Sequence, residues 1–439
     1  MKTNASLRRT VQQVVEGTPV LDIHTHLYDP AFGSLLLWGI DELLVYHYLV
    51  AEAFRQHRVA PAKFWALSRS EQADLIWDEL FLRRSPISEA CRGVVTTLNR
   101  LGLDVKRRDL AKLRRWFADQ RVDRHVTRVF EAAGVRQVCM TNSPFDDVER
   151  PVWEHGFEGD PRFLAALRID PLLMDWPVAC RRLAEWGYPV QLESPGSRKR
   201  RVDAQGLERG RGGTRPYRAR GITPGTADAV RRFLEDWTRR IGARYVMVSL
   251  PPEFTFPAQN DCSRLLEQAV LPFCRESGLP LALMLGVRRA VNPALELAGD
   301  GVGRSDLGAL ANLCAAYPSN RFLVTVLSRE NQHELCVLAR KFGNLHIFGC
   351  WWFTNVPHLI DEITRLRLEL VGLSCTPQHS DARVMDQLIY KWAHFREVLT
   401  GVLADKYCDL AAAGWPVGRA AIERDVQELF GGAFDRFCA

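Results

Sequence analysis

The residues with the clearest chemistry are His24 and His26, which flank Thr25 at the end of the apolar run 19–23. Successive side chains of a β-strand point to opposite faces, so residues i and i+2 share one face. Two imidazoles at this spacing, where a buried strand opens into a loop, can bind one divalent cation. The alternative is a purely structural pair, and what favours a metal site is an acidic residue far along the chain, Asp381.

Asp381 lies in the segment 380–383, Ser-Asp-Ala-Arg. Mixed imidazole and carboxylate ligands suit Zn²⁺, and also Mn²⁺ or Fe²⁺. Three protein ligands, His24, His26 and Asp381, leave positions open for water or substrate, as catalysis requires. His379 is a rival ligand, and the alternative for Asp381 itself is a helix N-cap or an exposed loop residue. The sequence therefore predicts one divalent metal ion, with zinc first among the candidates.

The elements that must position these residues follow from the hydrophobic pattern. Short apolar runs alternate with amphipathic helical patterns, which is typical of parallel βαβ units. Eight such runs predict an α/β protein with a closed (β/α)8 TIM barrel, in which chemistry gathers at the carboxyl ends of the strands. The predicted strands are 19–24, 136–141, 163–169, 244–250, 280–286, 321–327, 345–350 and 369–374. Since strand eight neighbours strand one when the barrel closes, Asp381 can meet His24 and His26.

Helical segments extend the predicted barrel. Residues 34–130 separate the first two strands by far more than one crossover helix needs, and they predict a helical insertion after strand one. Residues 384–439 also have a helical pattern and predict a helical C-terminal cap. The whole chain, 1–439, is expected to form a single metal-dependent barrel domain.

The composition bounds the class of protein. The 439 residues are 47% hydrophobic and 25% charged, which is ordinary for a soluble globular protein. Eleven cysteines without a Cys-x-x-Cys pair, and an N-terminal segment without the apolar core of a signal peptide, favour the cytoplasm. No apolar run approaches the roughly 18 residues of a membrane span. Homo-oligomerisation is left open.

The net charge of +6 comes from one Gly-rich segment. Between Arg198 and Arg220, nine Lys or Arg stand against two acidic residues, so this stretch carries +7 and the rest of the chain −1. Residues 195–222 are predicted as a basic flexible loop. The other interpretations are a nucleic-acid patch or an electrostatic funnel for an anionic substrate. Tyr217 is the one aromatic residue among the arginines, which argues against nucleic acid.

A series of motifs resembles the uronate isomerases, a branch of the amidohydrolase superfamily. The pair of histidines with Asp381 resembles the superfamily as a whole. Five further stretches are similar to family motifs in the same order: 45–48 to Asp-His-Tyr, 140–146 to Thr-Thr-Asp-Asp-Pro-x-Asp, 168–170 to Arg-Pro-Asp, 350–355 to Trp-Trp-Phe-Asn, and 380–383 to Asp-Ser-Arg. The resemblance spans nearly the whole chain, and together the motifs are more specific than each one alone.

The resemblance implies interconversion of an aldohexuronate and a ketohexuronate, of the glucuronate and fructuronate type. Proton transfer through an enediolate would then use Asp381 as metal ligand and general base. Arg383 would polarise the carbonyl or hold an oxyanion. His47 and Tyr48 would serve ring opening or contact hydroxyl groups.

The same resemblance implies residues that bind the sugar acid. Arg168, with Asp170 beside it, is the candidate for the substrate carboxylate, and a structural ion pair with Asp170 is the alternative. Trp351 and Trp352 would form an apolar wall against the sugar, and core packing is their alternative. Asn355 completes the substrate-binding set.

Two departures from the family pattern indicate a divergent member. Met284 stands where the family carries a His, and methionine cannot transfer a proton. Asp-Ala-Arg at 381–383 replaces Asp-Ser-Arg. Two alternatives therefore stay open: a metal-dependent hydrolase of a lactone, amide or ester, and a non-catalytic binding protein on the same barrel. Against the hydrolase, strands five and six end without the histidines that many hydrolases have there.

Overall fold

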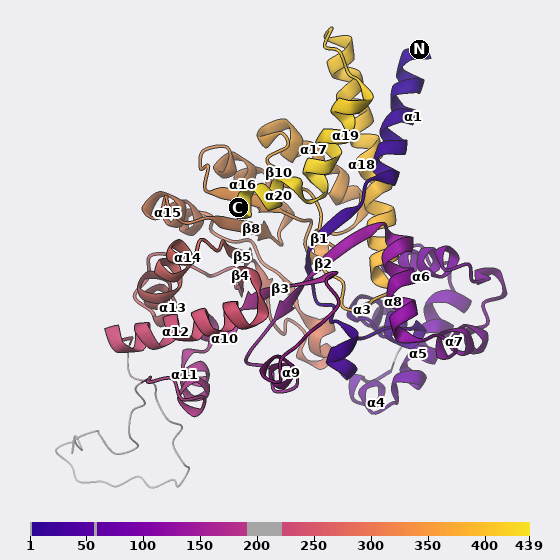
Figure 1. Cartoon of the computed structure of the whole chain (residues 1–439). Coiled ribbons are helices and arrows are strands. Elements are labelled where there is room, and N and C mark those ends of the chain that lie inside the picture. Colours follow the sequence, from indigo (N-terminus) through magenta and orange to yellow (C-terminus); the bar gives the residue numbers. More distant parts are fainter. Residues whose placement is uncertain (1, 57–58, 191–221) are drawn as a thin grey trace.

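The computed structural model describes residues 2–56, 59–190 and 222–439 (Figure 1). Eight parallel strands form one sheet in the order β1-β2-β3-β4-β5-β8-β9-β10, which curls as a (β/α)8 barrel and confirms the predicted fold class. The strands are β1 (Val20–Thr25), β2 (Val135–Asn142), β3 (Phe163–Arg168), β4 (Ala243–Leu250), β5 (Leu281–Leu285), β8 (Phe322–Val326), β9 (Leu345–Phe348) and β10 (Cys375–Thr376). The predicted basic loop 195–222 lies, apart from Ile222, outside the described residues.

Backbone hydrogen bonds just beyond β10 join the first and last strands. The backbone N–H of His26 donates to the carbonyl of Ala382 over 2.8 Å, and that of Asp381 donates to the carbonyl of His24 over 3.2 Å. The buried Asp22 carboxylate accepts a further bond from the backbone N–H of Ser380 over 3.1 Å. These bonds hold the segment 380–382 alongside β1, so Asp381 lies beside the two imidazoles.

Side chains of the strands alternate between the barrel interior and the layer of helices, as the strand period of two requires. The interior set contains Leu21, Ile23, Cys139, Ala166, Tyr245, Met247, Ala282, Met284, Leu323 and Phe348. Phe434 of α20 (Ala433–Cys438) packs against the same cluster, while Asp435 pairs with Arg244 at the start of β4. A filled interior keeps the strand ends in fixed positions for the site.

One predicted strand, 369–374, is wrong. Helix α17 (Pro357–Val371) continues through the first half of this stretch and ends before Gly372, which has φ 63°. The last strand, β10, begins only after the predicted stretch has ended. The last turn of α17 carries Leu368, Leu370 and Val371 against the core. Over so few residues the apolar pattern fits a strand and a helix equally. The error leaves Asp381 after the last strand, as predicted.

The remaining elements outside the barrel sheet follow each strand in turn. After β2 to β4 come α9 (Glu149–Glu154), α10 (Asp170–Met174), α11 (Trp176–Glu185), α12 (Pro224–Ile241), α13 (Asp261–Leu265), η4 (Leu266–Val270) and α14 (Leu271–Ser277). After β5 to β9 come the hairpin β6 (Val287–Arg288) and β7 (Gly301–Val302), η5 (Pro293–Gly299), α15 (Gly308–Ala316), η6 (Arg329–Asn331), α16 (Gln332–Ala339), η7 (Trp352–Thr354) and α17.

A group of helices lies between β1 and β2 and sits to one side of the sheet (Figure 1). Buried side chains such as Leu44, Phe64, Ile76 and Trp77 give it an apolar cluster of its own. Its elements are η1 (Pro30–Leu35), α2 (Ile40–Leu44), α3 (His47–Gln56), α4 (Pro61–Trp65), α5 (Arg69–Trp77), η2 (Asp78–Leu82), α6 (Glu89–Arg100), η3 (Val105–Arg107), α7 (Leu110–Ala118) and α8 (Val122–Ala133).

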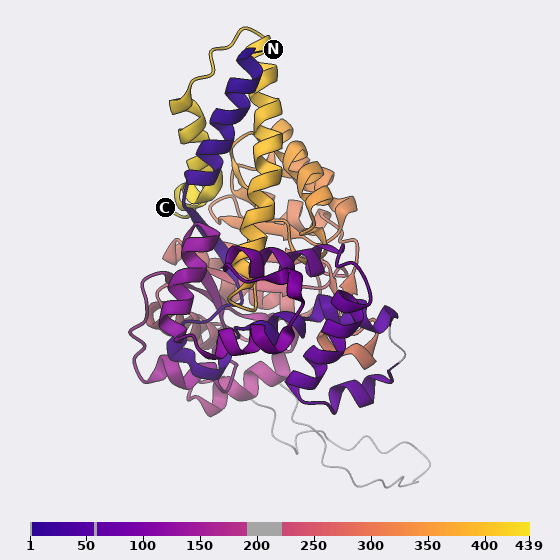
Figure 2. The same ribbon diagram turned by 90° about the vertical axis from the view of Figure 1, so that its right-hand side faces the viewer.

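The C-terminal region is helical, with α18 (Gln387–Ala412), α19 (Arg419–Gln427), η8 (Glu428–Gly432) and α20. Helix α1 (Lys2–Gly17) runs alongside α18, and both project beyond the barrel (Figures 1 and 2). The N-terminal half of α18 lies beside the segment that carries Asp381. Among the described helices, none combines the length and the apolar character that a membrane crossing needs.

His125 of α8 and Asp386, which precedes α18, form a fully buried ion pair with Nε2 and Oδ1 2.7 Å apart. The other oxygen of Asp386 accepts the backbone N–H of Gly39 over 2.8 Å. We expect His125→Leu to lower the free energy of unfolding by about 3 kcal/mol, because it leaves a buried carboxylate without its partner. Urea unfolding measures this loss.

His333→Leu, on the exposed face of α16, is the matched control for this substitution. It should change the free energy of unfolding by less than about 0.5 kcal/mol. An equally small change in His125→Leu would contradict a structural role for the buried pair.

Candidate active site

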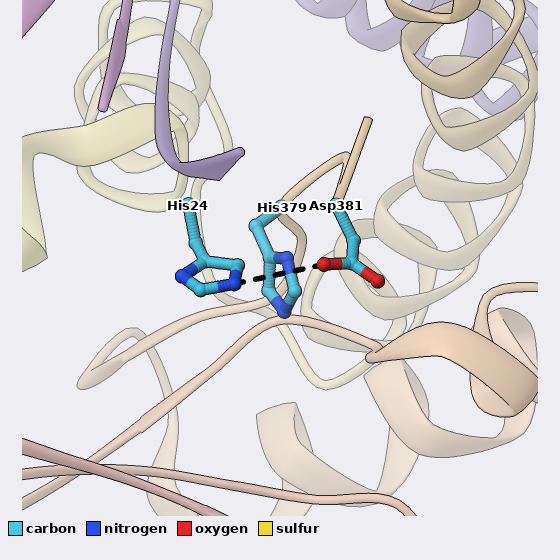
Figure 3. Close-up of side chains that lie close together, drawn as sticks. All are labelled: His24, His379 and Asp381. Atoms are coloured by element: carbon cyan, nitrogen blue, oxygen red, sulfur yellow. Dashed lines mark ion pairs between the residues drawn. The ribbon is translucent and has the colours of Figure 1, made fainter. Parts of the chain in front are cut away.

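Three buried side chains converge where the barrel closes: His24, His379 and Asp381 (Figure 3). Their ligand atoms lie within 4.8 Å of one another. The Nε2 atom of His24 lies 3.6 Å from Oδ1 of Asp381, and Nε2 of His26 lies 3.3 Å from the same oxygen. The cluster thus contains two of the predicted ligands, His24 and Asp381, and the rival ligand His379, while the third predicted ligand, His26, lies beside it.

These buried atoms have no hydrogen-bond partner among the described residues: Nε2 of His24, both ring nitrogens of His379, and Oδ1 of Asp381. Buried polar atoms without a partner are strongly unfavourable, so native proteins nearly always satisfy them. Nitrogen and carboxylate oxygen donors are also the ligand types that zinc, manganese and iron accept. The residues present therefore fit a divalent metal ion.

The protonation states in the cluster suit metal ligands. Burial and the nearby Arg383 charge lower the pKa of His26 to about 3, so its imidazole is neutral at pH 7. Burial by itself would raise the pKa of Asp381, but the facing imidazoles of His24 and His26 hold it well below its usual range. Neutral imidazole and ionised carboxylate are the forms that bind a metal.

Two neighbouring hydroxyl groups orient the histidines, and sequence reasoning missed both. Oγ1 of Thr141, on β2, lies 3.0 Å from Nδ1 of His26. The hydroxyl of Tyr245, on β4, lies 3.4 Å from Nδ1 of His24 and donates to the carbonyl of Ile23 over 2.7 Å. Such partners fix a ring so that its other nitrogen faces the ligand cluster. Thr141 lies in the family-like stretch 140–146, but its contact with His26 arises only when the barrel closes, and no local sequence signal marks Tyr245.

A pocket of about 520 Å³ opens beside His26 at the carboxyl ends of the strands. Its wall includes three predicted residues: Arg168, Asp170 and Arg383. Arg168 donates through Nη2 to Oδ1 of Asp170 over 2.7 Å, the one hydrogen bond of this guanidinium within the described chain. Oδ2 of Asp170 is buried and unpartnered. At this part of the wall, Arg168 retains N–H donors and Asp170 retains an acceptor oxygen that no described residue occupies.

A buried carboxylate that sequence reasoning missed, Glu149, supports the same pocket. It accepts hydrogen bonds from the side chains of Asn142 (2.7 Å), Tyr28 (3.0 Å) and Trp153 (3.1 Å), and from the backbone of Ser143 (3.0 Å). Burial raises the pKa of Glu149. The four donors hold the carboxylate of Glu149 in place. Its hydrogen bond with Tyr28 therefore fixes the position of the phenol, which lines the pocket.

His47 and Tyr48 begin α3, with ring centroids 4.5 Å apart, and His47 also meets Trp352 of η7 at 5.3 Å. Both ring nitrogens of His47 and Nε1 of Trp352 are buried and unpartnered. Burial, and then the charge of Arg383, lower the pKa of His47 well below its usual range. None of these three residues lines the 520 Å³ pocket, so the predicted residues form two groups around the histidine cluster.

The backbone is strained at two of the predicted positions. Trp352 has φ 46° and Asp381 has φ 52°, in the left-handed region that residues other than glycine rarely adopt. A bulky side chain such as Trp352 keeps this conformation only where the surrounding structure holds it. Such strain is typical of functional sites, and here it affects one member of the cluster, Asp381, and one predicted substrate-binding residue, Trp352.

Asn355 and Trp351 have contacts within the chain. The amide of Asn355 donates to the carbonyl of His379 over 3.2 Å and accepts from the side chain of Gln378 over 3.2 Å. Asn355 therefore supports the segment that carries His379. Trp351 is buried in the barrel-interior cluster. The substrate-binding roles of Asn355 and Trp351 stay predictions.

Met284 lies in the barrel interior and is 1% exposed. Its partners in register on the two neighbouring strands are Ser249 and Thr325. Neither side chain is ionised near neutral pH, so the adjacent strands β4 and β8 place no acid–base group in register with Met284.

Solved structures with the same fold include three sugar-acid isomerases. A uronate isomerase from Bacillus halodurans C-125 is 48% identical, with a TM-score of 0.90 over 99% of this chain and 96% of its own. A uronate isomerase from Thermotoga maritima (14% identity, TM-score 0.74, 98% and 97% covered) and a glucuronate isomerase from Caulobacter crescentus (16%, 0.72, 99% and 94%) share the fold. A scan against protein-family models and a search of curated proteins found no match.

Proposed function

This chain belongs to the uronate isomerase family, and we propose that it interconverts an aldohexuronate and a ketohexuronate, of the glucuronate and fructuronate type, through an enediolate. The observation that carries the proposal is Asp381 facing His24 and His26, beside a pocket lined by two arginines. The chain is thus an isomerase, and its similarity to isomerases does not favour the hydrolase or the non-catalytic alternative.

We propose that His24, His26 and Asp381 hold one divalent cation, with zinc first among the candidates and His379 as the alternative third ligand. His26 is favoured because Thr141 orients its ring, whereas neither nitrogen of His379 has such a partner. When bound, the ion would act as a Lewis acid that stabilises negative charge on the substrate oxygens.

We propose that the sugar ring opens before the carbonyl moves and that His47 and Tyr48 carry out this step. The neutral imidazole of His47 accepts the proton of the C1 hydroxyl, and Tyr48 donates its proton to the ring oxygen. The bond between C1 and the ring oxygen breaks, its electron pair stays on that oxygen, and C1 becomes an aldehyde. The proton then returns from His47 to the Tyr48 oxygen, since the two rings are neighbours.

Asp381 then moves the hydrogen between the carbons. Its carboxylate removes the proton at C2, and the released electron pair forms the C1–C2 double bond while the C1 oxygen becomes negative. Arg383 stabilises that oxygen. The C2 hydroxyl proton passes to the C1 oxygen, and Asp381 returns its proton to C1, which leaves a ketone at C2.

Arg168 is the proposed partner of the substrate carboxylate. We expect Arg168→Met to raise KM roughly 30- to 150-fold and to change kcat much less, because one charge-assisted hydrogen-bond partner contributes about 2 to 3 kcal/mol. Steady-state kinetics with an aldohexuronate measures the effect. Arg162→Met is a matched control: Arg162 also pairs with an aspartate two residues away, at the opposite end of β3. An unchanged KM in Arg168→Met would exclude this assignment.

The proposed activity is tested by incubation with glucuronate and galacturonate in the presence of Zn²⁺ or Mn²⁺. Formation of a ketohexuronate above the background without enzyme is the expected result. No ketose from either substrate would contradict the proposal, and a parallel panel of lactones would detect hydrolysis instead.

A further inference from the structure

Lys391, on the N-terminal half of α18, is a buried cation that the proposed mechanism does not use. Its side chain is 4% exposed. The ammonium lies over the ring of Tyr48 and over the ring of Tyr390, 5.4 Å from each centroid. Within the described chain it forms no hydrogen bond and no ion pair. The closest interactions of the Lys391 ammonium are therefore cation–π contacts with two phenol rings.

The charged groups around Lys391 act on it through space, and most are engaged elsewhere. Glu89 of α6 pairs with His394 over 2.6 Å, and Asp22 of β1 accepts the indole N–H of Trp392 over 2.8 Å. The titratable groups that face it from the surrounding elements are Asp22, His47, Tyr48, Glu89, His379, Asp381 and Tyr390.

A buried charge without a close partner destabilises a fold, and an apolar side chain of similar length is usually more stable in its place. Packing therefore does not explain a lysine here. One of the two rings that the ammonium contacts belongs to Tyr48, the group proposed to donate a proton during ring opening. Burial, followed by the neighbouring Tyr46, raises the pKa of Tyr48 well above its usual value, which makes this phenol a poor acid on its own.

We propose that Lys391 is a positioning residue for the reaction, whose ammonium stabilises the negative charge on Tyr48 while the phenol proton resides on the ring oxygen of the substrate. Charge on a phenolate spreads over its ring, so a desolvated cation at the ring face attracts it more strongly than it attracts the neutral phenol. Because that charge exists only during proton transfer, Lys391 favours the transition state over the ground state. This role rests on the proposed function.

The charge state of Lys391 agrees with this role. Burial lowers the pKa of Lys391 to about 8, although Asp381, Glu89 and Asp22 counteract part of that effect. At pH 7 the ammonium is therefore mostly charged.

A double-mutant cycle tests the proposal. We expect Lys391→Met to lower kcat about tenfold to a hundredfold, part of the roughly 100- to 10,000-fold that acid–base catalysis contributes. In the Tyr48→Phe background the same substitution should change kcat less than about twofold, because no phenolate forms there. Lys406→Met is the matched control: Lys406 lies further along the same helix, partly exposed and paired with Glu369, and this variant should keep the wild-type kcat.

Thermal unfolding separates this role from a structural one. At pH 7, Lys391→Met should unfold at a higher temperature than the wild type, because it removes a buried charge. Between pH 8 and the unfolded-chain value of 10.5, folded Lys391 releases its proton before the unfolded chain does. The wild type gains relative stability as pH rises through this window, so the difference in Tm should shrink.

Three results would overturn the proposal: an unchanged kcat in Lys391→Met, an equal loss with and without Tyr48, or a lower Tm in Lys391→Met at pH 7. Lys391→Gln, which also removes the charge, is measured in the same cycle and should show the same dependence on Tyr48. A wild-type enzyme that forms no ketose from any aldohexuronate would instead refute the proposed function. If the wild type is active but Lys391→Met lowers kcat by the same factor with and without the Tyr48 hydroxyl, only the role of Lys391 would be refuted.

Discussion

Replacement of Asp381 by asparagine should lower kcat for uronate isomerisation by at least about a thousandfold. The amide keeps the shape of the carboxylate but cannot accept the C2 proton, and it is a weaker ligand for a divalent cation. The backbone bonds that hold this segment, such as that from the Asp381 N–H to the His24 carbonyl, do not depend on the side chain. We therefore expect the fold to remain intact.

The measurement is ketose formation together with exchange of the C2 hydrogen in deuterated water, followed by nuclear magnetic resonance. The asparagine variant should show neither reaction. Asp409→Asn, on the exposed surface of α18, is the control and should retain the wild-type rate. Activity of Asp381→Asn within tenfold of the wild type would exclude Asp381 as the base.

Loss of the metal should have a comparably large effect. We expect the purified protein to hold about one divalent ion per chain, and His24→Asn and His26→Asn to lose it together with nearly all activity, since such an ion contributes several kcal/mol to charge stabilisation. His379→Asn should retain the ion with weaker affinity. Inductively coupled plasma mass spectrometry of the variants, after dialysis against a chelator and readdition of Zn²⁺, measures both quantities.

The same series decides the third ligand. His333→Asn, on the exposed face of α16, controls for nonspecific loss of metal and should match the wild type. A variant series in which His379→Asn loses the ion while His26→Asn keeps it would assign the third position to His379. A metal-free wild type that is fully active would refute the centre altogether.

The fold could be predicted because its signals are local. Seven of the eight strands lie within a few residues of their predicted positions, since their apolar runs are short and bounded by Gly, Pro or Asn. The exception is β10, where the apolar end of α17 precedes a strand of two residues. A strand this short leaves almost no pattern in the sequence, and its place is determined by pairing with β9.

The pair of histidines, Asp381 and the two arginines could be found because each lies next to a recognisable strand end or motif. The roles of Thr141, Tyr245 and Glu149 could not, although Thr141 lies in a family-like stretch, because each acts on a side chain of another strand or loop. Lys391 leaves only a faint trace, a single charge within the apolar stretch 388–393.

The sequence by itself determined the alternating strands and helices, the histidine pair at the end of β1 and the order of the family-like motifs, because these depend on neighbouring residues. Only the tertiary structure decided which side chains face one another. Barrel closure through the segment 380–382 brings His24 and Asp381 together with His379, and the packing of α18 against α6 and α8 accompanies the contact of Lys391 with Tyr48. These contacts join residues hundreds of positions apart, so they arise from packing rather than from any local pattern.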